Sequence, residues 1–131
     1  MNSNNFNFAD ILKVTEDFYA KATTDFLIGY HFRNITDFKT HIPRIAHFWE
    51  LQLTGTISKP DELPYRLMGV HFALKIKKGE LGRWVLLFKE VLESHRKLNP
   101  EKKNVFDLWE TKINFFQAKF LQHPHLFHQD A

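Results

Sequence analysis

Large apolar side chains recur three or four positions apart through most of this chain, and this spacing constrains the fold more than any other feature. Leu81, Trp84, Phe88 and Val91 advance by three, four and three residues, and a second stripe of the same kind lies within residues 106–120. A helix with 3.6 residues per turn brings such positions onto one face. No stretch alternates apolar and polar residues as a half-buried strand does. The sequence therefore predicts an all-α fold.

Capping residues and helix breakers divide this pattern into four predicted helices. Asp10 and Thr40 are the expected N-caps of the first two helices. Pro43 fits this reading because proline is tolerated in the first turn of a helix, and Gly29 is expected to stop the first helix. The predicted helices cover residues 9–27, residues 40–54 up to Thr54-Gly55, residues 81–95, and the segment from Asn99-Pro100-Glu101 to Pro124.

The composition indicates one folded domain over residues 1–131, with an N-terminal extension (1–8) and a flexible, histidine-containing tail (123–131). Fourteen Phe, three Trp and three Tyr exclude a disordered chain. The absence of cysteine excludes disulfides and thiolate sites, and it fits a reducing compartment. The first residues lack the basic start and apolar core of a signal peptide, and no apolar run is long enough to span a membrane. We therefore expect a cytoplasmic protein without a membrane partner.

The eight histidines of the chain are its main candidates for metal-binding or catalytic residues. Most histidines in helical proteins lie on the surface or are hydrogen-bonded in the core, and we assign His31, His47 and His95 to that class. The histidines of the tail suggest at most adventitious metal binding in a solvated segment.

His41 differs from these because of its neighbours on the predicted second helix. At 100° per residue, Ile45 falls about 40° from His41 and Phe48 about −20° from it, so the three share one face. Such a face suits a flat, apolar ligand, and Arg44 at its edge is placed to meet a carboxylate. The spacing alone equally fits an ordinary amphipathic helix that begins with a polar residue.

His71 is embedded in the apolar run Val70-His71-Phe72-Ala73-Leu74. A neutral imidazole in such a place can ligate iron through one nitrogen while the other bonds a backbone carbonyl. It can also be a half-buried histidine of a short helix, and spacing does not choose between the two.

The ordered set of these segments resembles the truncated haemoglobins, group III most of all. It consists of Phe18-Tyr19, Phe32, the stretch His41-Ile42-Pro43-Arg44-Ile45-Ala46-His47-Phe48-Trp49, and Val70 to Leu74 followed by Arg83-Trp84-Val85-Leu86-Leu87-Phe88. Together the segments span residues 18–88.

The resemblance implies a shortened globin fold in which two helix pairs enclose haem b. His71 would then be the proximal iron ligand, and Tyr19, His41 and Trp84 would be hydrogen-bond donors on the distal side. Arg44 would meet a haem propionate. The apolar wall implied by the resemblance comprises Phe32, Ile45, Phe48 and Phe88.

The same resemblance implies ferrous iron that binds O₂, NO and CO, with an unidentified reductase as partner. Tight binding of O₂ favours reaction over bulk transport, as in NO dioxygenation or a weak peroxidase reaction with peroxide. One alternative is a haem-free globin fold that acts as a sensing or interaction module. A nucleic-acid binder is disfavoured because the net charge is only +3; its basic residues would be Lys75, Lys77, Lys78, Arg83 and Lys89.

Overall fold

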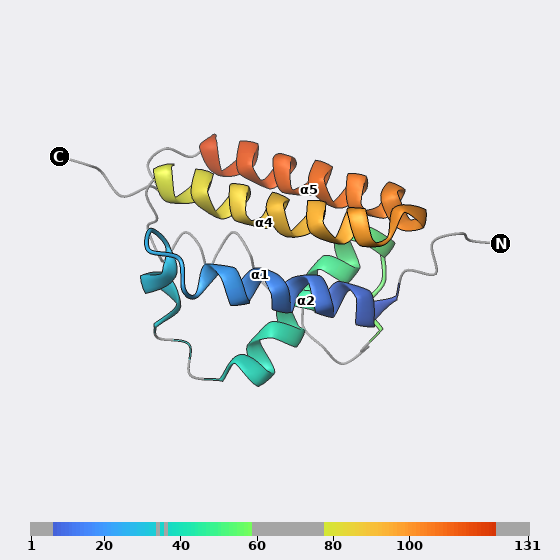
Figure 1. Ribbon diagram of the computed structural model, residues 1–131, viewed down its shortest axis with the longest axis horizontal. Coiled ribbons are helices and arrows are strands. Elements are labelled where there is room, and N and C mark those ends of the chain that lie inside the picture. Colours follow the sequence, from blue (N-terminus) through green and yellow to red (C-terminus); the bar gives the residue numbers. More distant parts are fainter. Residues whose placement is uncertain (1–6, 34, 36, 59–77, 123–131) are drawn as a thin grey trace.

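The computed structural model describes residues 7–33, 35, 37–58 and 78–122, and all the regular elements among them are helical (Figure 1). The all-α prediction is therefore confirmed for this part of the chain. The α-helices are α1 (Phe8–Ala22), α2 (Phe38–Thr54), α4 (Lys78–Leu98) and α5 (Lys103–Leu121), and two short 3-10 helices are η1 (Gly29–Phe32) and η2 (Pro100–Lys102).

The four α-helices form two contacting pairs, α1 with α2 and α4 with α5, and α1 also packs against α4. In Figure 1, α4 and α5 run side by side, with α1 along the lower side of α4 and α2 crossing α1. Three aromatic rings fill the centre between the pairs. The ring centroid of Phe88 lies 5.5 Å from that of Trp49 and 5.7 Å from that of Trp109. Burial of these large side chains holds the two pairs together.

The observed N-caps of α1 and α2 each lie three residues before the predicted N-cap, at Asn7 and Asp37. The side chain of Asn7 accepts the N–H of Asp10, and that of Asp10 accepts the N–H of Asn7, so the two form a capping box. In α2, the carboxylate of Asp37 accepts the N–H of Thr40. The predicted caps are thus third-position residues, and Pro43 lies within α2, in the second turn, and not in the first turn as predicted.

The first helix is shorter than predicted, since α1 ends at Ala22 and the chain turns before η1. The carboxylate of Asp25 accepts two backbone N–H groups that follow it, at 3.0 and 3.1 Å, and so stabilises the turn. Gly29 begins η1, where a Cβ atom would lie only 2.9 Å from the backbone oxygen of Thr23. The close approach of these two backbone segments explains the glycine.

The remaining helix ends agree more closely with the sequence. Gly55 terminates α2 in the left-handed conformation, with φ of 83°, as the Thr54-Gly55 signal predicts. Helix α4 extends about one turn beyond the predicted segment at each end, so it begins at Lys78 and ends at Leu98. The predicted start after Asn99 is confirmed as η2, which leads into α5. Pro124 lies outside the described residues.

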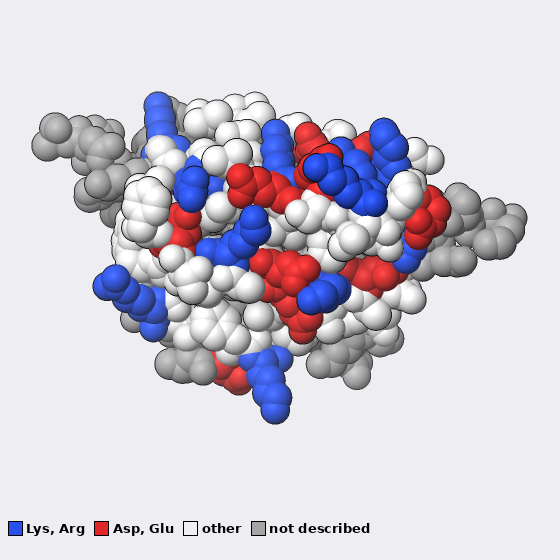
Figure 2. All heavy atoms as spheres, viewed as in Figure 1, with Lys and Arg blue, Asp and Glu red and all other residues white. Residues whose placement is uncertain are grey.

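Charged side chains of both signs are interspersed over the face in Figure 2. Of the basic residues considered for nucleic acid, Arg83 forms an ion pair with Asp25, whereas Lys75 and Lys77 lie outside the described residues. No helix in the described part of the chain has the length and apolar character needed to cross a membrane.

Candidate functional site

Tyr19 and His41 meet between α1 and α2. The hydroxyl oxygen of Tyr19 lies 2.9 Å from Nε2 of His41, although the two residues are 22 positions apart in the sequence. The tyrosine is buried, with 8% of its surface exposed, and the histidine is half-buried. The resemblance implied that both residues lie on the distal side of a haem pocket, and in the structure they are in contact.

The environment of His41 favours the neutral imidazole. Its burial lowers the pKa of the imidazole, and the nearby positive charge of Arg44 lowers it further. In the tautomer that carries the proton on Nε2, His41 donates to the oxygen of Tyr19, and the phenolic proton can then be donated to a third group. The pair can therefore offer a hydrogen bond to a polar ligand without carrying a net charge.

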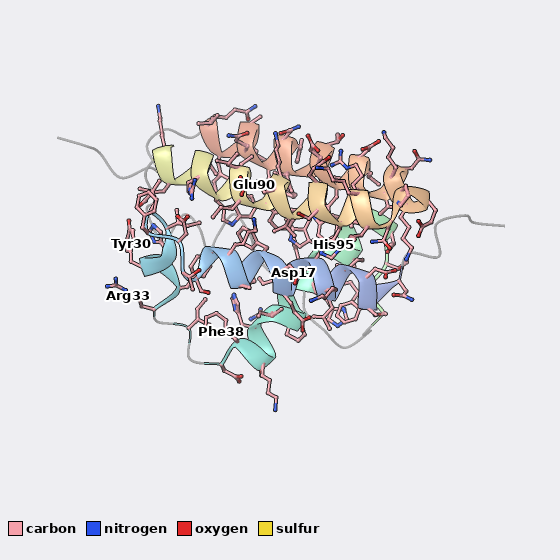
Figure 3. The ribbon with its side chains drawn as sticks, in the orientation of Figure 1. Asp17, Tyr30, Arg33, Phe38, Glu90 and His95 are labelled. Atoms are coloured by element: carbon pink, nitrogen blue, oxygen red, sulfur yellow. The ribbon has the colours of Figure 1, made fainter. Side chains whose placement is uncertain are left out.

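The ring of Tyr19 is surrounded by aromatic side chains. The ring of Phe32 meets it edge-on at 5.5 Å, and that of Phe38 at 6.1 Å. Phe32 was a predicted wall residue, but the predictions did not include Phe38, which begins α2 (Figure 3). A local signal for it exists, because Phe38 precedes His41 by three residues and so shares its helix face.

Trp84 joins this cluster from α4 through Phe18, a second residue that the site predictions did not include. The ring of Phe18 lies 5.6 Å from that of Tyr19 and 5.5 Å from that of Trp84. Phe18 directly precedes Tyr19 on α1, and it also contacts the ring of Phe88 at 4.6 Å. The three predicted polar side chains thus lie around one aromatic cluster, with the indole of Trp84 half-buried.

Ile45, Phe48 and Phe88 are buried as predicted, but two of them serve the core. The ring of Phe48 lies 5.0 Å from Trp49 and 5.6 Å from Phe116 of α5. Phe88 is 1% exposed and lies in the central aromatic group. Ile45 is 6% exposed, and Arg44 is exposed on the same helix, as expected for a residue at the rim of a site.

The other described histidines each face a carboxylate. His31 lies 3.1 Å from Glu80, and His47 lies 3.0 Å from Glu50. His95 lies 2.7 Å from Asp17, and Figure 3 shows this pair between α1 and α4. These contacts agree with the assignment of the three histidines to structural roles.

Within residues 7–58 and 78–122, as far as these are described, no group of three or more His, Cys, Asp or Glu side chains is arranged to hold a metal ion. His71, the predicted iron ligand, lies outside the described residues.

Comparison of the chain with protein-family models, with curated proteins and with solved structures gives no match. The regular elements of the described residues are all helical, and a tyrosine–histidine pair lies among aromatic rings between α1 and α2.

Proposed function

We propose that this chain is a truncated globin, similar to group III of that family, which binds haem b and takes O₂, NO or CO as its ligand. The observation that carries this proposal is the 2.9 Å hydrogen bond between Tyr19 and His41. These are the two residues that the resemblance assigns to the distal side, and they come from separate helices. The pairing of α1 with α2 and of α4 with α5 also supports a shortened globin fold.

The chemistry of the side chains fits haem. Buried Ile45 and aromatic Phe32 offer apolar surface, while Phe48 and Phe88 would back the site from the core. The exposed guanidinium of Arg44 would meet a propionate at the rim. In this proposal His71 is the proximal ligand. Haem b would supply a ferrous iron that binds diatomic gases reversibly.

The chain's own contribution is a set of hydrogen-bond donors in apolar surroundings. The hydroxyl of Tyr19 and the N–H of the His41 imidazole are two of these donors, and the indole of Trp84 is a third donor on α4. A hydrogen bond to a charged group contributes roughly 1.5–3 kcal/mol. Because about 1.4 kcal/mol corresponds to a factor of ten, two such bonds would slow ligand release by more than about a hundredfold.

A protein that releases O₂ slowly is better suited to reactions of the bound O₂ than to O₂ transport. We therefore propose O₂-dependent oxidation of NO, or a weak reaction with peroxide, as the activity, with a reductase as the redox partner. The rings of Phe32 and Phe38 contact the ring of Tyr19, which is 8% exposed, and hydrogen bonds are stronger in such apolar surroundings than in water.

The test is a titration of the purified protein with haemin, followed by absorption and by quenching of tryptophan fluorescence. The proposal predicts saturation at one equivalent and a spectrum that shifts when CO is added after reduction. The variants Tyr19→Phe and His41→Leu should still bind one haemin, because these residues act on the gas and not on the iron. Absence of a defined haem spectrum would overturn the proposal and favour the haem-free module.

A further inference from the structure

A buried carboxylate connects η1 to the first turn of α4. Glu80 is only 5% exposed, and the hydroxyl of Tyr30 donates a hydrogen bond to its Oε2. Nε2 of His31 lies 3.1 Å from Oε1 of the same carboxylate. The bond to Glu80 raises the pKa of Tyr30 to about 12, so the phenol keeps its proton at neutral pH. Two adjacent residues thus fix both oxygens of Glu80.

A second polar contact lies beside the first. One oxygen of Asp25 lies 2.9 Å from Nε and 2.6 Å from Nη2 of Arg83, and its other oxygen accepts two backbone N–H groups of its own turn. The carboxylate is 4% exposed. Because two N–H groups of the guanidinium donate to one carboxylate oxygen, these charge-assisted bonds fix the orientation of the Arg83 side chain as well as its distance from Asp25. We call these five residues (Asp25, Tyr30, His31, Glu80 and Arg83) the corner clamp.

The corner clamp adjoins the candidate site in two places, near Trp84 on α4 and near Tyr19 through η1. Glu80 precedes Trp84 by four positions on α4, so the two lie on one helix face about one turn apart. On the other side, Phe32 belongs to η1 and meets the ring of Tyr19 edge-on at 5.5 Å. The same short segment therefore contacts the helix that carries Trp84 and the ring of Tyr19.

Building on the proposed function, we propose that Glu80 and Arg83 are positioning residues that hold the indole of Trp84 in place for hydrogen bonding to the bound gas. The first turn of a helix frays because its N–H groups have no partner within the helix. Trp84 lies in the second turn of α4, so fraying at Lys78–Gly79 would shift the indole. The clamp anchors this end of the helix to η1.

The clamp can be weakened without disturbing the core. Tyr30→Phe removes one donor from a side chain that is 44% exposed, and Glu80→Gln removes the charge but keeps the shape. Glu90→Gln is the matched control, because Glu90 is an exposed carboxylate on the same helix that pairs with Lys21 at 3.5 Å.

Two measurements are required. The first is the ¹H–¹⁵N signal of the Trp84 indole in the purified protein, assigned by its loss in Trp84→Phe. The signal should move or broaden in Tyr30→Phe and Glu80→Gln and stay in place in Glu90→Gln. The second is the O₂ dissociation rate, which should rise roughly threefold to tenfold in both clamp variants, as partial loss of one hydrogen bond implies.

A clamp that acts through Trp84 should have no further effect on O₂ release in the Trp84→Phe background. An unchanged indole signal in both clamp variants would overturn this proposal, whether or not the protein binds haem. Equal acceleration of O₂ release in the presence and absence of Trp84 would overturn it as well. A protein that binds no haem would refute the proposed function separately, and the indole signal would still decide whether the clamp positions Trp84.

Discussion

Replacement of Tyr19 by phenylalanine removes one oxygen atom and tests the centre of the candidate site. The ring is buried and contacts Phe32 and Phe38 edge-on, so the phenylalanine ring should occupy the same place. The hydroxyl bonds His41 at 2.9 Å, and this hydrogen bond is lost in the variant. His41 is only half-buried, so water can replace the lost partner.

The expected effect follows from two hydrogen bonds of different strength. A bond from Tyr19 to a bound gas that carries partial charge contributes roughly 1.5–3 kcal/mol, and a neutral bond such as that to His41 about 0.5–1.5 kcal/mol. In the tautomer in which Nε2 of His41 accepts from Tyr19, the hydroxyl gives up the weaker bond to form the stronger one, and the net gain is about 1.2 kcal/mol, or roughly eightfold. In the tautomer in which Nε2 donates, both bonds persist and the gain is larger. Tyr19→Phe should therefore speed O₂ dissociation by roughly tenfold.

The assay is stopped-flow displacement of O₂ by CO from the reduced protein. Thr15→Val is the control, because it removes a buried hydroxyl from the same helix, where Thr15 bonds the oxygen of Ile11 at 2.8 Å. The control should lose stability without a change in the O₂ dissociation rate. A rate in Tyr19→Phe equal to that of the wild type would refute the reasoning, because the hydroxyl would then not face the ligand.

Three further predictions concern charge and backbone. Arg44→Gln should raise the pKa of His41, as read from the ring C–H shifts in an NMR titration, because the charge of Arg44 is one cause of its lowering; an unchanged pKa would contradict this. Since the pKa of His41 is lowered in the fold, this residue should reduce stability as the pH falls below about 6.5, where the unfolded chain takes up the proton first. Asp25→Asn should destabilise the protein at pH 7 by roughly 1–3 kcal/mol. The bond to Arg83 lowers the pKa of Asp25, so urea unfolding at pH 3 should show a smaller difference, and equal differences at the two pH values would be the contrary result. Gly55→Ala should lower the thermal midpoint, at a cost of about 1–2 kcal/mol, because φ there is 83°; an unchanged midpoint would contradict it.

The helices were largely predictable, because apolar stripes report the period of the backbone directly. The helix ends were harder to predict where the cap is formed by a pair of residues. In the first helix, Asn7 and Asp10 form a capping box, and only Asp10 was predicted as a cap. The end of α1 had no sufficient local signal. The turn at Asp25 is stabilised partly by Arg83, which lies 58 positions away.

The site was predictable only in part. Helical angles placed His41 and Ile45 on one face, but only the resemblance placed Tyr19 on the same side as His41, and the hydrogen bond between the two was not predicted. Apolar stripes do not distinguish a core from a pocket wall, which is why Phe48 was expected beside the ligand and is found against Phe116. Phe38 carried a usable signal in its spacing from His41.

Binding of haem through His71, as proposed above, can be tested by the absorption spectrum of the purified protein. The spectrum should be recorded for the wild type and His71→Gly, as isolated or after addition of haemin, then after reduction and under CO. His125→Gly, in the 123–131 tail, controls for adventitious coordination by other histidines. We expect an intense Soret band that shifts with CO, is lost or altered in His71→Gly and is unchanged in His125→Gly. No Soret band in the wild type after haemin is added, or the same band in His71→Gly, would contradict it.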